Sequence, residues 1–65
     1  MITVNGETLE IQKGSTLLEL LEARGYRLGV IAVELNGTIL NKDAYGTTPL
    51  HDGDKLEIVS FVGGG

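Results

Sequence analysis

Residues 2–24 read ITVNGETLEIQKGSTLLELLEAR, and this stretch decides the fold. Its first ten residues alternate apolar and polar side chains on either side of Asn5-Gly6. Asn-Gly tolerates the positive φ angles of a type I′ turn, so the pattern predicts a β-hairpin. The apolar side chains that we expect on its buried face are Ile2, Val4, Leu9 and Ile11.

A helix is predicted directly after the hairpin. Thr16 and Glu19 have the spacing of a capping box, in which each side chain satisfies a backbone N–H group of the first turn. Gly25 can adopt the left-handed conformation that ends a helix in a Schellman motif. We therefore expect a helix over residues 17–24, too short to be stable without packing against a sheet. Its apolar stripe consists of Leu17, Leu18, Leu20 and Leu21.

The remaining strands follow the same alternation. Residues 30–35 form one strand, Asn36-Gly37 predicts a second tight turn, and residues 39–40 pair briefly beyond it. Residues 54–61 form the last strand. The side chains expected to point into the core from these strands are Ile31, Val33, Leu35, Leu56 and Ile58.

These elements together predict an α+β roll with one main helix. Residues 41–53 are rich in turn formers, and we expect Tyr45 and Leu50 to cover the core from there. A helix that connects two strands of one sheet makes a right-handed crossover, which places it on one face of a mixed four- to five-stranded sheet. A chain of 65 residues has room for one core. We expect one domain over residues 1–62 and a flexible glycine tail over residues 63–65.

Composition excludes several classes of function. Nine acidic against five basic residues give a net charge of −4, without the basic stripe that nucleic acid or an anionic membrane requires. The absence of cysteine excludes disulfides, thiolate metal sites and a thiol nucleophile. No secretory signal pattern and no long apolar run occur, so we expect a cytoplasmic protein.

An active site within the chain is also not indicated. His51 is the single histidine, and Ser15 and Ser60 lack an obvious partner base. Asp52-Gly53-Asp54 lacks the spaced oxygen donors of a calcium loop and is typical of a turn before a strand. We therefore predict no catalytic residue, no metal site and no bound cofactor.

The glycines are the unusual feature of the composition. There are 10 in 65 residues, about twice the average content. Seven stand at predicted turns or at the helix end, but Gly63, Gly64 and Gly65 follow the last core strand. Terminal glycines are often only a frayed end. Three in a row also make a thread without Cβ atoms, about 10 Å long when extended, that can enter a narrow tunnel and present the Gly65 carboxylate there.

With these features the chain resembles the ubiquitin-like β-grasp proteins throughout its length, and among them the ThiS family of sulfur carriers. The segments that carry the resemblance are Ile2-Thr3-Val4-Asn5-Gly6, Thr16-Leu17-Leu18-Glu19-Leu20-Leu21, Val33-Glu34-Leu35-Asn36-Gly37, Asp52-Gly53-Asp54-Lys55-Leu56-Glu57-Ile58-Val59 and Phe61-Val62-Gly63-Gly64-Gly65. Each segment alone is weakly specific, but their order, the chain length and the glycine ending together are specific.

The resemblance implies a function in thiamine biosynthesis. A ThiF-like adenylyltransferase would use ATP and Mg²⁺ to adenylate the Gly65 carboxylate, while Gly63 and Gly64 enter its active site. A persulfide donor protein would supply the sulfur of a thiocarboxylate on Gly65, and thiazole synthase (ThiG) would accept that sulfur. The chain itself would be a carrier and not an enzyme.

A docking surface is predicted from the alternation of the last strand. Leu56 and Ile58 point inward, so Val59 and Phe61 fall on the open sheet face beside Ala32, as an apolar patch for a partner. The alternative is that Phe61 covers the edge of the core. On the same face, two carboxylates would complement a basic rim on the partner, those of Glu34 and Glu57.

Three other functions remain open at the level of sequence. A MoaD-like carrier for molybdopterin or another sulfur product would share the glycine ending, although such carriers are typically longer. A β-grasp interaction module would bind partners without chemistry at its tail. A glycyl adenylate would also acylate lysines, as in ubiquitin-type tagging.

Overall fold

The first hairpin forms as its sequence predicts. In the computed structural model, which describes residues 1–61, β1 (Ile2–Val4) and β2 (Glu7–Leu9) are antiparallel. Asn5 and Gly6 between them have φ angles of 51° and 84°, as a type I′ turn requires. The second strand ends at Leu9 and does not continue to Ile11, whose side chain still packs against the core.

The capping motifs predicted for the two ends of the helix are confirmed in α1 (Leu17–Ala23). The Thr16 N–H donates to Glu19 Oε1 at 2.8 Å, and the Glu19 N–H donates to Thr16 Oγ1 at 3.2 Å. At the other end the amides of residues 25 and 26 donate to the carbonyls of residues 22 and 21, the two hydrogen bonds of a Schellman motif. The helix ends one residue earlier than predicted.

A second hairpin completes the sheet. The 3₁₀ helix η1 (Leu28–Val30) leads into β3 (Ile31–Leu35), and Asn36-Gly37 turns the chain into β4 (Thr38–Leu40). The strand predicted from residue 30 therefore begins at residue 31. After the 3₁₀ helix η2 (Lys42–Thr47), the chain returns as β5 (Lys55–Ser60).

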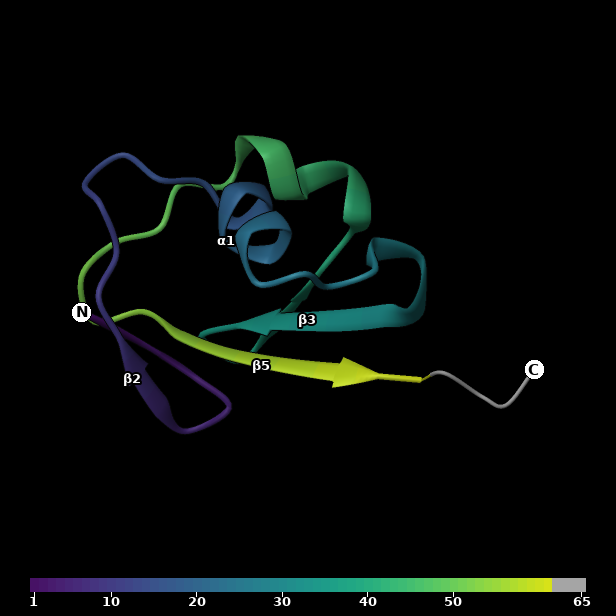
Figure 1. Ribbon diagram of the computed structural model, residues 1–65. Helices are drawn as coiled ribbons and strands as arrows, with labels where there is room; N and C mark the ends of the chain where they lie inside the picture. Colours follow the sequence, from purple (N-terminus) through teal and green to yellow (C-terminus); the bar gives the residue numbers. More distant parts are fainter. Residues whose placement is uncertain (62–65) are drawn as a thin grey trace.

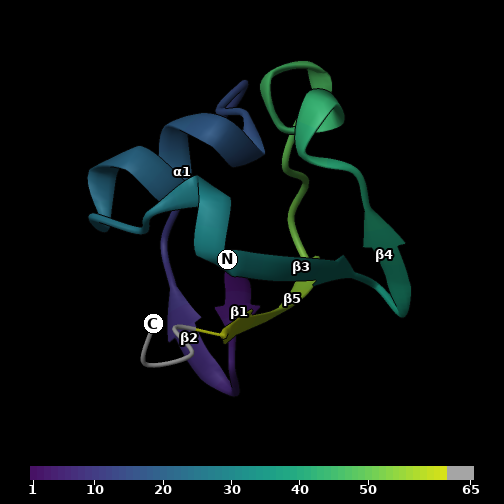
Figure 2. The ribbon, with the colours of Figure 1, turned by 90° about the vertical axis from the view of Figure 1, so that its right-hand side faces the viewer.

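The sheet has the strand order β2-β1-β5-β3-β4, with β5 at its centre. Strand β1 runs parallel to β5, whereas β3 is antiparallel to it. Helix α1 and the η2 segment cover one face of the sheet, and the opposite face is left open in both views (Figures 1 and 2). The fold is the predicted mixed five-stranded roll with one main helix.

The core lies between this layer and the sheet. Tyr45 and Leu50 are 2% and 3% exposed, which confirms that the long connection covers the core. Within residues 1–61 no helix is long and apolar enough to cross a membrane. The buried apolar residues are Ile2, Val4, Leu17, Leu21, Ile31, Val33, Tyr45, Leu50, Leu56 and Ile58.

Candidate functional site

The strand that leads to the glycine tail is held firmly at its last described residue. The Phe61 N–H donates to the carbonyl of Val30 at 2.8 Å, which extends the pairing of β5 with β3 to residue 61. The predicted tail residues Gly63, Gly64 and Gly65, and the predicted domain boundary after residue 62, lie outside the described residues. The structure therefore defines the paired ends of β3 and β5, called here the platform, after which the tail residues follow in the sequence.

The platform carries an exposed apolar patch on the open face, formed by Ala32, Val59 and Phe61 and called here the tail-proximal patch. Ala32 lies directly opposite Val59 in the β3–β5 pairing. Val59 is 60% exposed and Phe61 is 57% exposed, so the predicted exposure of both side chains is confirmed. Covering the core edge accounts for less than half of the Phe61 surface. The docking role of the patch stays a prediction.

An acidic row crosses the open face next to this patch. Glu34 and Glu57 lie directly opposite each other on β3 and β5, a pairing of like charges that destabilises a sheet. Ile39 on β4 lies opposite Glu34 and is 71% exposed, so it extends the row with an apolar side chain. Exposure of Ile39 was not predicted, although the inward orientation of Leu40 implies it.

Strand β5 is also held by an asparagine side chain that sequence reasoning missed. Asn5 Oδ1 accepts a hydrogen bond from the Ile58 N–H at 2.7 Å, and Asn5 Nδ2 donates to the Ile58 carbonyl at 3.1 Å. The amide thus acts as one further residue of β1, beyond the point where the backbone turns away. The only signal in the sequence is the choice of asparagine before Gly6, which the turn alone explains.

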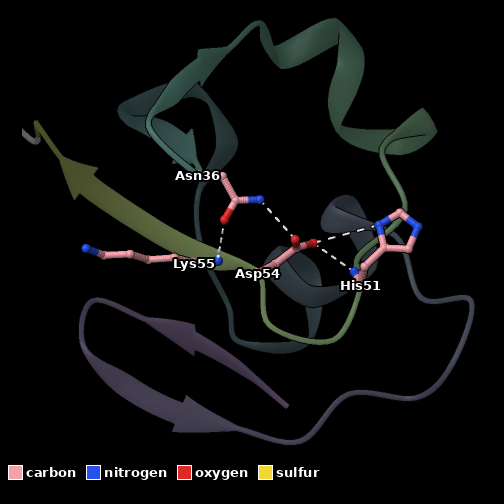
Figure 3. Close-up of polar contacts among 4 residues, drawn as sticks. All are labelled: Asn36, His51, Asp54 and Lys55. Atoms are coloured by element: carbon pink, nitrogen blue, oxygen red, sulfur yellow. Dashed lines mark hydrogen bonds and ion pairs between the residues drawn. The ribbon is translucent and has the colours of Figure 1, made fainter.

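The start of β5 is fixed by a second asparagine (Figure 3). Asn36 Nδ2 donates to Asp54 Oδ1 at 2.9 Å, and Asn36 Oδ1 accepts from the Lys55 N–H at 2.9 Å. The His51 N–H donates to Asp54 Oδ2 at 2.8 Å. Both asparagines of the two Asn-Gly turns therefore hold β5, one from each side.

The electrostatics at the start of β5, around Asp54, fit a structural role. Burial raises the pKa of the Asp54 carboxyl, but hydrogen bonds from the His51 amide and the Asn36 side chain, with the nearby His51 ring, outweigh burial and lower the pKa. The His51 ring is largely exposed, and its Nδ1 lies 4.0 Å from Asp54 Oδ2. Over residues 1–61, no group of three His, Cys, Asp or Glu side chains is placed to hold a metal ion.

Comparisons with known proteins identify the family of the chain. The model of the ThiS family matches residues 2–65. The sulfur carrier protein ThiS of Bacillus subtilis is 36% identical, with 100% of both chains covered. The crystal structure of the thiamine biosynthesis protein ThiS from Geobacter metallireducens superposes with a TM-score of 0.79 at 37% identity, covering 98% of this chain and 97% of that one.

A longer relative contains a similar segment. The thiazole synthase of Magnetococcus marinus is 38% identical over 98% of this chain, which corresponds to 20% of that protein. This chain thus spans about a fifth of the length of the thiazole synthases that it matches. In those relatives a segment like this chain is therefore part of a protein named thiazole synthase.

Proposed function

This chain belongs to the ThiS family and has its ubiquitin-like β-grasp fold, and from this premise we propose that it carries sulfur for thiazole formation in thiamine biosynthesis. The observation that carries the proposal is the position of β5. The central strand of the sheet carries Val59 of the tail-proximal patch, and in the sequence Gly63-Gly64-Gly65 follow within a few residues of its end. A rigid domain would then present a thin reactive arm beside a surface that a partner can grip.

The proposed chemistry begins at the Gly65 carboxylate. A carboxylate resists nucleophiles because it is negatively charged and has no leaving group. A carboxylate oxygen would attack the α-phosphorus of ATP in a ThiF-like adenylyltransferase, with Mg²⁺ on the phosphates, and release pyrophosphate. The product is an acyl-adenylate, whose AMP is a good leaving group.

Sulfur would then replace the AMP. The terminal sulfur of a protein persulfide attacks the glycyl carbonyl carbon, the bond to AMP breaks, and an acyl disulfide results. A thiol then attacks the sulfur of the donor protein, which becomes oxidised to a disulfide, and the thiocarboxylate leaves with the electron pair of the broken S–S bond. This chain contains no cysteine, so every thiol in the sequence of steps belongs to a partner.

Thiazole synthase (ThiG) is the proposed acceptor of the sulfur. The relatives in which a similar segment is part of a thiazole synthase support this assignment, because fusion keeps a carrier close to the enzyme it serves. In this scheme the chain is a protein substrate, and its own side chains bind partners and do not catalyse.

The tail-proximal patch and the acidic row are the proposed docking surface for the partner enzyme. Val59 and Phe61 offer exposed apolar surface within a few residues of the reacting carboxylate, where an anchor positions the tail best. Glu34 and Glu57 would pair with basic side chains of the partner, which would also relieve their mutual repulsion. The net charge of −4 would speed the encounter with such a surface.

The test is adenylation by the ThiF protein of the same organism. With ATP and Mg²⁺, we expect exchange between pyrophosphate and ATP that depends on this chain, together with an intact mass that corresponds to the adenylate. A matched control is the chain shortened by Gly64 and Gly65, which keeps the whole described domain. Absence of exchange with the full chain, while it still binds the enzyme, would refute the carrier function and favour a non-covalent interaction module.

A further inference from the structure

The backbone groups of β5 point alternately to its two neighbours. The Lys55 carbonyl accepts a hydrogen bond from the Asn36 N–H, and the Phe61 N–H donates to the Val30 carbonyl. The backbone N–H and C=O groups of the odd-numbered residues of β5 therefore point toward β3. The even-numbered residues consequently face the β1 side, as the hydrogen bond from the Asn5 N–H to the Leu56 carbonyl shows.

On the β1 side the pairing stops before β5 does. Strand β1 has three residues and β5 has six. The Asn5 side chain takes both backbone groups of Ile58, and the chain then turns away into β2. Figure 1 shows β5 continuing past the tip of the β1–β2 hairpin. Within residues 1–61 no strand pairs with β5 on this side beyond Asn5, and we call this space beside β5 the vacant lane.

Ser60 is the residue whose backbone faces the vacant lane. It lies opposite Ile31 in a pair that exchanges no hydrogen bonds, because the neighbouring Phe61 N–H bonds to Val30. By this alternation the Ser60 N–H and carbonyl point away from β3, and within residues 1–61 strand β1 ends before it reaches them. Both groups are thus available at a sheet edge.

We infer that an extended segment of the adenylating enzyme enters the vacant lane as an added strand and pairs with the backbone of Ser60, a proposal that rests on the carrier function given above. Strand addition to a sheet edge gives affinity through main-chain hydrogen bonds and specificity through alternate side chains. Here the alternate side chains would meet Val59 and Phe61 of the tail-proximal patch.

The position of Ser60 argues for the enzyme that receives the tail as the occupant. Gly65 comes five positions after Ser60 in the sequence, which corresponds to roughly 17 Å of fully extended chain. A strand paired at Ser60 would therefore fix the direction of the tail where it leaves the domain. Long unpaired edges promote self-association. A single free residue offers only two hydrogen bonds, too few for a second copy of this chain without further contacts.

The test compares two substitutions at Ser60. Ser60→Pro removes the N–H and fills the lane with its ring, yet takes no hydrogen bond from the free domain, and proline is tolerated at strand edges. Ser60→Ala removes only the hydroxyl and is the matched control. With the ThiF protein of the same organism as probe, we expect Ser60→Pro to raise the dissociation constant about tenfold or more and Ser60→Ala to leave it within about twofold.

Amide hydrogen exchange on the unmodified chain gives a second, independent reading. We expect the Ser60 amide to exchange rapidly in the free protein and at least about tenfold more slowly in the complex. Wild-type binding by a folded Ser60→Pro chain, or unchanged Ser60 exchange in the complex, would overturn strand addition. Adenylation of the wild-type chain distinguishes this failure from failure of the proposed function, because a carrier that docks elsewhere is still adenylated.

Discussion

The two ends of β5 differ in almost every respect. At its start, Asn36 bonds to the Lys55 N–H, Asp54 is held by two donors, and β1 and β3 flank the strand on both sides. At its end, Val59 and Phe61 are more than half exposed, and among the described strands Ser60 has a neighbour only on the β3 side. The start therefore stabilises the fold, and the end remains available for partners. Substitutions along one strand can separate the two roles.

The largest effect on stability is expected at the buried side of the strand. Leu56 is 0% exposed, so Leu56→Ala should lower the free energy of unfolding by about 2–5 kcal/mol through lost burial and a residual cavity. Urea denaturation measures this. Val59→Ala, on the exposed face of the same strand, is the control and should cost less than about 1 kcal/mol. Equal losses would abolish the contrast between the two ends.

The next-largest effect is expected on the rate of adenylation, without a change in stability. Gly64→Val adds a branched side chain to the proposed thread, so we expect adenylation to fall about 100-fold through misplacement of the carboxylate. The free energy of unfolding should stay unchanged, because the buried core of the described chain lies between residues 2 and 58. Kinetics of pyrophosphate release and urea denaturation measure the two quantities. Normal adenylation of this variant would rule out a narrow tunnel for the tail.

A smaller effect is expected at the tail-proximal patch. Phe61→Ala removes exposed apolar area, so the KM of the chain in adenylation should rise about tenfold, with kcat little changed. Thermal unfolding should show a stability loss below about 1 kcal/mol, because more than half of Phe61 is already exposed to water. A large stability loss combined with an unchanged KM would assign Phe61 to the edge of the core.

The smallest effect is a pH dependence at the start of the strand. The pKa of Asp54 is lowered in the folded protein, so its contribution to stability is present above the ordinary carboxyl pKa of about 4 and is lost as the pH falls through the folded value. Urea denaturation between about pH 6 and about pH 3 should show a steeper loss for the wild type than for Asp54→Asn. Identical slopes for the two proteins would mean that the Asp54 carboxylate does not stabilise the start of β5.

Local patterns in the sequence were sufficient for the elements but not for their register. The alternation in residues 2–11 and the Thr16–Glu19 spacing predicted the hairpin and the helix start, because those interactions join residues close in sequence. The bond between Asn5 and Ile58 spans 53 positions, and no local pattern reports it.

The candidate site was likewise predictable only where local alternation determines it. Exposure of Val59 and Phe61 follows from alternation once Leu56 and Ile58 point inward. The direct opposition of Glu34 and Glu57 depends on strand register, and the open position of Ser60 depends on the unequal lengths of β1 and β5. Both are properties of the assembled sheet.

In the proposed function, β5 delivers a reactive glycine carboxylate to a partner enzyme. The most direct test is fragmentation mass spectrometry of the chain after incubation with the ThiF protein, ATP, Mg²⁺ and a protein persulfide. We predict that one oxygen is replaced by one sulfur and that only fragments containing Gly65 carry the change. An unchanged mass, or sulfur on fragments that lack Gly65, would contradict the proposal that the chain carries sulfur at Gly65.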